Sequence, residues 1–187
     1  FEEAGILKTS FIGYNKSQVL TKIVGFVKGD KVVEECMQGE ECALLLEKTP
    51  FYSEGGGQVG DSGVLIADEN PVFQVNDTVE VDGYYLHYGK SSKNLGKGAS
   101  VQAVIDEERR RQIERHHSAT HLLHAAMKNI LGGHINQAGS RVNEHSLRFD
   151  YTHPEALSKN LISEIEIAVN QQILSAFPIE TSYSSLA

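Results

Sequence analysis

The pattern of apolar residues changes near residue 105, and this change constrains the fold more than any other feature. Before it, short β-branched and aromatic runs alternate with Gly, Asp and Asn turns, which is typical of a small barrel or sandwich. After it, apolar residues recur at helical spacing over 106–131 and again from Pro154 to about residue 176. The sequence therefore predicts an α+β fold, with an all-β unit over 1–105 and a helix–sheet unit over 106–187.

Individual elements follow from the same pattern. In the first unit, strands are expected over 20–27, 31–36, 42–46, 62–67, 72–79, 81–88 and 100–105, with a hairpin turn at Asp82-Gly83. In the second, strands are expected over 135–142 and 147–151 and an extended segment over 179–184. Gly132-Gly133 is expected to end the first helix.

Composition limits the classes of partner. The formal net charge of −8 argues against binding of DNA or RNA through a diffuse basic surface, but it is compatible with a local pocket for one RNA end. No apolar run approaches the roughly 18 residues of a membrane span, so no membrane partner is expected. Cys36 and Cys42 are too few for a disulfide framework, which predicts reduced thiols and a cytoplasmic location. The chain lacks a starting Met, and we expect it to be cut from a longer polypeptide.

Four of the eight histidines lie within His116–His124. A helix here places His117 and His121 one turn apart on the same side, which is half of a tetrahedral zinc site. Ser118 stands where a zincin protease carries its catalytic Glu, so that class is excluded. The alternative is a histidine-rich helix edge whose imidazoles bond to neighbouring groups. The nearby Arg109, Arg110, Arg111 and Arg115 are expected to form a solvated face, or alternatively to meet phosphates.

A second unusual stretch is the glycine-rich loop 51–61, which contains three consecutive glycines. Glycines allow close approach of the backbone or positive φ angles, yet the spacing fits neither a P-loop nor a dinucleotide fingerprint. The loop is therefore either a flexible hairpin connection or a binding loop. The polar residues Glu54, Gln58 and Asp61 around the glycines favour the binding loop.

Taken together, these stretches resemble the editing domain of alanyl-tRNA synthetases. The resemblance rests on the glycine-rich loop 51–61 and on the motifs Arg115–Ala126, Leu131-Gly132, Gln137–Ser140 and Leu147–Tyr151. It covers most of the chain, including the opening Phe11–Tyr14, and it implies a β-barrel followed by most of an editing domain. The related editing domain of threonyl-tRNA synthetases shares the histidine motif, but the glycine loop and residues 147–150 look more alanyl-like.

The resemblance implies an activity and a set of residues. The family's editing domain hydrolyses the ester between serine or glycine and the alanine tRNA, because an alanine pocket cannot strongly reject amino acids so similar in size. His117 and His121 would be zinc ligands and catalytic residues, and Gln137 would lie close to the substrate's side chain. Substrate contacts are expected from Glu54, Gly56, Gly57, Gln58, Asp61 and Thr120. ATP and Mg²⁺ would serve only an aminoacylation domain before residue 1.

The chain departs from the family pattern at the zinc site. The family's other two ligands come from a Cys-x-x-x-His motif, and no cysteine follows Cys42. We therefore expect the second unit to be truncated at its C-terminus, and the chain alone to bind zinc weakly or not at all and to have little editing activity. Two other functions remain open: a free-standing deacylase that edits mischarged tRNA in trans, and a non-catalytic tRNA-docking module.

Overall fold

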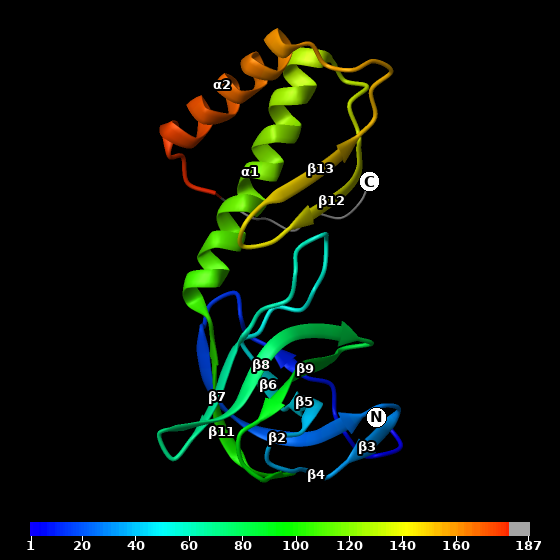
Figure 1. Cartoon of the computed structure of the whole chain (residues 1–187), viewed down its shortest axis with the longest axis vertical. Coiled ribbons are helices and arrows are strands. Elements are labelled where there is room, and N and C mark those ends of the chain that lie inside the picture. Colours follow the sequence, from blue (N-terminus) through cyan, green and yellow to red (C-terminus); the bar gives the residue numbers. More distant parts are fainter. Residues whose placement is uncertain (180–187) are drawn as a thin grey trace.

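The computed structural model of the chain describes residues 1–179. Figure 1 shows an elongated molecule with a β-barrel at one end and two helices with a β-hairpin at the other, joined by the long helix α1. This is the α+β arrangement expected from the sequence. The extended segment expected over 179–184 falls almost wholly outside the described residues.

Six strands form the barrel, which closes because β2 pairs with β11 at the two ends of the sheet order β11-β7-β8-β9-β5-β2. Closure leaves no unpaired strand edge within this ring. The strands are β2 (Gln18–Lys28), β5 (Glu41–Leu46), β7 (Gly63–Ala67), β8 (Asn70–Val81), β9 (Tyr84–Ser91) and β11 (Ser100–Ile105). The structure thus decides between the barrel and the sandwich that the strand pattern left open.

Shorter strands decorate the barrel. The strand expected over 31–36 is divided into β3 (Lys31–Val33), which extends the β2 edge, and β4 (Glu35–Cys36), which pairs with β10 (Leu95–Gly96). β1 (Ser10–Phe11) runs parallel to β6 (Lys48–Thr49), directly before the glycine-rich loop. The expected turn at Asp82-Gly83 is confirmed, with both residues at positive φ between β8 and β9.

The barrel interior holds the largest apolar cluster of the chain. Phe26, Leu44 and Phe51 are fully buried there. His87 is also fully buried: its Nδ1 donates to the Leu44 carbonyl (2.9 Å), so its Nε2 accepts from the Thr49 hydroxyl (2.7 Å). Burial lowers the pKa of His87 to about 4. The imidazole is therefore a neutral core residue that fixes the strand leading into the glycine-rich loop.

Helix α1 (Glu107–Leu131) agrees to within one residue with the helix expected over 106–131. The Asp106 side chain caps it by accepting from the Arg109 backbone N–H (3.0 Å), and the left-handed φ of Gly132 ends it. Ile113 and Met127 are buried along one side. This side packs against the hairpin and the second helix.

Helix α2 (Lys159–Ser175) begins later than Pro154, so the expected start was wrong. Ser158 is the true N-cap, since its hydroxyl accepts from the Leu161 backbone N–H (3.3 Å). The four-residue apolar spacing also drifts by about 40° per step around a helix. Ile165 is therefore buried, whereas Ile173 is 51% exposed.

The hairpin consists of β12 (Gln137–Val142) and β13 (Leu147–Tyr151), with a bulge after Gln137. β12 starts two residues later than expected because the Ile135 N–H donates to the Gly132 carbonyl in a turn (3.2 Å). The Asn143 side-chain oxygen accepts from the backbone of His145 and Ser146 and closes the turn between the strands. The hairpin places Gln137 and Ser140 beside the glycine-rich loop.

Two further expectations concern the cysteines and the membrane. Cys36 and Cys42 are buried free thiols with their sulfurs 3.0 Å apart, and burial raises the pKa of Cys42. Within residues 1–179, neither α1 nor α2 combines the length and the apolarity needed to cross a membrane.

Candidate functional site

The glycine-rich loop reaches across to the hairpin and pairs with β12. The Gly57 carbonyl accepts from the Val142 N–H (2.7 Å), and the Val142 carbonyl accepts from the Val59 N–H (3.1 Å). Gly57 has a φ of +84°, and a Cβ at this position would lie 2.5 Å from the carbonyl oxygen of Ser140. The glycines thus allow the loop to approach β12 so closely that a larger residue would clash.

This approach carries Gln58 to the histidine helix. The His117 Nδ1 and the Gln58 Oε1 are 2.6 Å apart, and Gln58 is only 6% exposed. A carbonyl oxygen only accepts, so Nδ1 carries the proton and Nε2 presents its lone pair. Burial, followed by the neighbouring His121, lowers the pKa of His117. Both effects favour the neutral imidazole, which is the form that binds metal ions.

His117 and His121 lie together on α1, as their spacing predicts. Their ring centroids are 5.1 Å apart, with the ring planes inclined by 20°. The pair fits half of the tetrahedral donor set of zinc, and the Gln58 hydrogen bond is the kind of outer contact that orients such a ligand. Residues 1–179 contain no group of three His, Cys, Asp or Glu side chains arranged to hold a metal ion.

Asp61 is buried and makes its contacts within the fold. Its carboxylate is 2% exposed, accepts from the Tyr52 N–H (2.9 Å) and forms a forked ion pair with the Arg110 guanidinium. The Arg110 side chain is itself only 12% exposed. The solvated face expected for Arg110 is therefore corrected, because Arg110 and Asp61 together anchor α1 to the loop. The substrate contact expected for Asp61 stays a prediction.

Arg109 was also expected on the solvated face, and it too is a junction residue. Its guanidinium donates to the Gly60 carbonyl (2.8 Å) and pairs with Glu144 in the turn after β12 (3.1 Å). Two turns further, His116 Nδ1 lies 2.8 Å from the Asn143 carbonyl. The first turns of α1 are thus fixed to both the glycine-rich loop and the hairpin. The exposed Arg111 and Arg115 do form the predicted solvated face.

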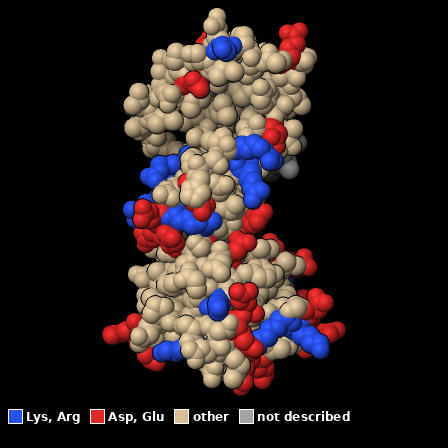
Figure 2. Space-filling view, in the orientation of Figure 1, with Lys and Arg blue, Asp and Glu red and all other residues tan. Residues whose placement is uncertain are grey.

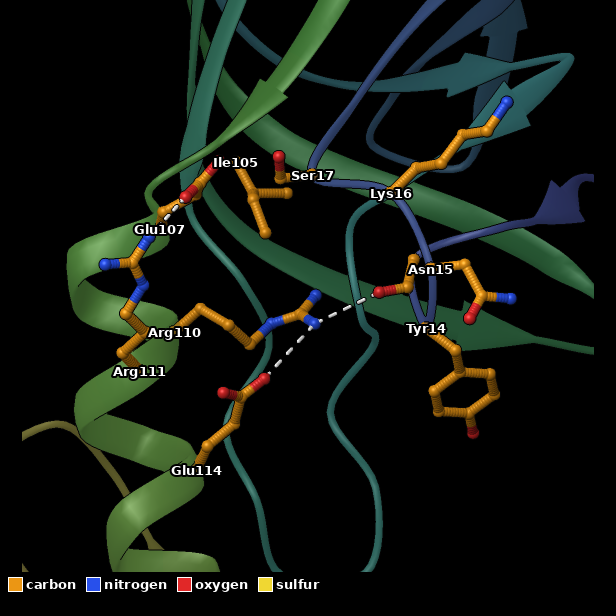
Figure 3. Close-up of a pocket in the computed structure, with 10 residues that line it drawn as sticks. Tyr14, Asn15, Lys16, Ser17, Ile105, Glu107, Arg110, Arg111 and Glu114 are labelled. Carbon is orange, nitrogen blue, oxygen red and sulfur yellow. Dashed lines mark hydrogen bonds and ion pairs between the residues drawn. The ribbon is translucent and has the colours of Figure 1, made fainter.

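The pocket drawn in Figure 3 lies between the first turns of α1 and the loop 13–17, away from the histidine pair. Its arginines already have partners, since Arg111 pairs with Glu107 and Arg110 reaches toward Glu114 and the Gly13 carbonyl. This pocket therefore belongs to the anchoring of the helix.

The remaining predicted site residues divide into two groups. Gln137 is exposed, and its side chain donates to the Ser140 hydroxyl (3.1 Å), which in turn lies 3.5 Å from the Gly56 carbonyl. Glu54 is exposed at the start of the loop. Thr120 is different, because it is buried and its hydroxyl donates to the His116 carbonyl within the helix (2.8 Å). The expected substrate contact of Thr120 stays a prediction.

Comparison with known proteins agrees with the resemblance of the motifs. Residues 2–109 match the family model described as tRNA synthetases class II (A). The chain belongs to this family. It is 41% identical to an alanine–tRNA ligase of Acetivibrio thermocellus over 96% of its length, and 43% identical to those of Leptospira biflexa and Haemophilus influenzae over 97% and 93%. The chain spans about a fifth of the length of these relatives.

Proposed function

We propose that this chain is the part of an alanyl-tRNA synthetase that removes serine or glycine from mischarged alanine tRNA. The observation that carries the proposal is the arrangement around His117, whose Nε2 is left unprotonated by the Gln58 contact beside the ring of His121. The relatives named alanine–tRNA ligase support the family context. An amino-acid pocket that admits serine and glycine with alanine requires a second, hydrolytic site.

The residues have separate roles in this proposal. His117 and His121 would hold zinc, which when bound supplies a Lewis acid for the ester carbonyl or for water. Gln58 orients His117, and the exposed Gln137 contacts the amino-acid side chain of the substrate. Backbone groups of Gly56 and Gly57 line the approach of the terminal nucleotide. Asp61 and Arg110 act indirectly by holding the loop and the helix in register.

The test is hydrolysis of Ser-tRNA by a full-length synthetase that contains this chain. We expect His121→Ala to lower the hydrolysis rate by more than about 100-fold, because a lost ligand should cost at least as much as a lost outer contact. The control is His145→Ala, whose side chain is 84% exposed in the hairpin turn. Equal rates in both variants would contradict the role of His121. Release of serine by the short chain supplied in trans would instead favour the free-standing deacylase.

The 187-residue chain by itself contains two of the four zinc ligands that the resemblance implies. We therefore expect it to bind zinc weakly or not at all. Metal analysis of the purified chain after dialysis checks this expectation. A stoichiometric, tightly held zinc ion that disappears in His121→Ala would contradict it and would indicate that other residues of the chain complete the site.

A further inference from the structure

All six arginines of the chain lie between residues 109 and 148, whereas the barrel carries only lysines as basic residues. Figure 2 shows that basic side chains gather around the middle of the molecule, where the hairpin and the first half of α1 lie. Arginine is the residue that suits planar, bidentate contacts with phosphate. The concentration of this one residue type in an acidic chain requires an explanation.

The fold explains some of the arginines. Arg109 and Arg110 anchor α1, and Arg111 forms an exposed ion pair with Glu107. Arg115 lies on the same exposed side of the helix as Arg111. The two that remain, Arg141 and Arg148, lie on the hairpin and contact neither the loop nor the helix through any ion pair within residues 1–179.

The arginines of the hairpin stand directly opposite each other. Arg141 on β12 is the register partner of Arg148 on β13, and both are exposed. Their neighbours Val142 and Phe149 point to the other face, toward α1, where Phe149 lies against His124. Like charges at opposed positions destabilise a hairpin. Asp150 offsets only one of the charges, through its contact with Arg148 (3.1 Å).

We propose that Arg141 and Arg148 bind backbone phosphates of the RNA strand whose 3′ end enters the site at His117. This inference rests on the proposed function. Arg141 follows Ser140, which touches the glycine-rich loop, and it lies four residues from Gln137 along the hairpin strand. Val142, the next residue, pairs with Gln58, which contacts His117, so Arg141 lies close to the histidine pair.

The exposed side of the hairpin that carries Arg141 and Arg148 is better suited to RNA than to an anionic membrane. Electrostatic membrane binding generally uses clusters of about four to eight basic residues, whereas this face has two. Two guanidinium groups on adjacent paired strands can instead contact a small number of phosphates held at fixed positions. The nearby carboxylate of Asp150 then limits the affinity, which suits a product that must be released.

The test is a titration of the 187-residue chain with a fluorescent RNA hairpin that copies the acceptor stem and its single-stranded 3′ end. Anisotropy is followed between about 50 and 200 mM salt. We expect the double variant Arg141→Gln/Arg148→Gln to raise Kd by about tenfold or more. The slope of log K against log salt should fall by about 1.4 to 1.8, since two phosphate contacts are lost.

Two single variants sharpen the result. Asp150→Asn removes the competing carboxylate and should lower Kd, whereas Arg115→Gln, on an exposed side of α1, should change it by less than about twofold. Thermal unfolding of each variant shows that the hairpin is intact. If the double variant binds RNA like Arg115→Gln, the proposal is wrong. Binding of the wild-type chain to anionic phospholipid vesicles, lost in the double variant while RNA binding is unchanged, would also overturn it.

The two proposals fail in different ways. In a full-length synthetase, the double arginine variant should raise KM for Ser-tRNA hydrolysis and leave kcat unchanged. His121→Ala should abolish kcat and leave RNA binding intact. An unchanged KM in the arginine variant would refute the phosphate contacts alone. Normal hydrolysis by His121→Ala, with RNA binding still dependent on the arginines, would refute the editing site alone.

Discussion

The barrel and the helix–hairpin unit are stabilised in different ways. The barrel buries a large apolar cluster that includes Phe26, Leu44 and Phe73. The main cluster in the second unit has four buried members, Ala126, Met127, Ile135 and Ile165. Leu174 and Phe177 at the end of α2 are 82% and 73% exposed. The second unit therefore has a much smaller core than the barrel. The barrel can nevertheless hold the functional site of that unit in position.

The contact between the two regions is polar. It includes the Arg110–Asp61 pair, the Arg109 hydrogen bond to the Gly60 carbonyl, the Gln58–His117 hydrogen bond, and the backbone hydrogen bonds of Gly57 and Val59 with Val142. Polar contacts have fixed directions and lengths, so they determine geometry better than apolar packing does. The histidine pair is therefore placed by the barrel through the glycine-rich loop.

The largest effect is expected from breaking the junction. Asp61→Asn leaves the buried Arg110 charge without its partner, which should lower the free energy of unfolding by about 3–5 kcal/mol. Urea denaturation measures this loss. Glu107→Gln is the matched control, because it breaks the exposed pair with Arg111 and should cost far less free energy than the loss of the buried pair. Equal losses in both variants would mean that the junction does not depend on the buried pair.

Truncation of a core side chain should lower the free energy of unfolding by different amounts in the two regions. Leu44→Ala in the barrel should cost about 2–5 kcal/mol, because the closed sheet cannot collapse around the cavity. Ile165→Ala in α2 should fall at or below the low end of that range, since its surroundings are partly open and can relax. Hydrogen exchange would show which region each variant loosens. A costlier Ile165→Ala would reverse the comparison between the regions.

The barrel should also respond to pH through His87. The unfolded chain binds a proton at this histidine below about pH 6.5, whereas the folded chain does so only near pH 4. Stability should therefore fall as the pH decreases from about 6.5 to about 4, by at most about 3 kcal/mol from this group. Unfolding measured across this range in wild type and His87→Gln isolates the contribution. A pH slope that persists unchanged in the variant would assign it to other groups.

The smallest effect is expected at the exposed end of α2. Leu174→Ser should change the free energy of unfolding by no more than about 0.5 kcal/mol, because the side chain is already in contact with water. Thermal unfolding of the 187-residue chain gives the value. A loss above about 1 kcal/mol would show that this residue packs against part of the protein in solution.

Local signals in the sequence predicted the elements better than they predicted the contacts between them. The bounds of α1 followed from Asp106 and Gly132, which act within the helix and its ends. Pro154 misplaced the start of α2, since the cap hydroxyl of Ser158 defined it instead.

The candidate site shows the same division. The spacing of His117 and His121 predicted that they lie together on one side of a helix, and their rings are indeed adjacent. The partners Gln58 and His117 are 59 residues apart, and Asp61 and Arg110 are 49 apart. The periodic pattern of a local segment does not predict contacts between residues so far apart in the sequence. The sequence therefore did not show that the side chains of Asp61 and Thr120 also form hydrogen bonds within the fold.

The protonation state of His117 tests the central claim most directly, namely that the glycine-rich loop prepares this residue as a ligand. Two-dimensional ¹⁵N–¹H NMR of the imidazoles in the 187-residue chain distinguishes a proton on Nδ1 from one on Nε2. The structure predicts the Nδ1–H form for His117 at neutral pH, and loss of this preference in Gln58→Leu. A His117 that carries its proton on Nε2 in the wild-type chain would contradict the account.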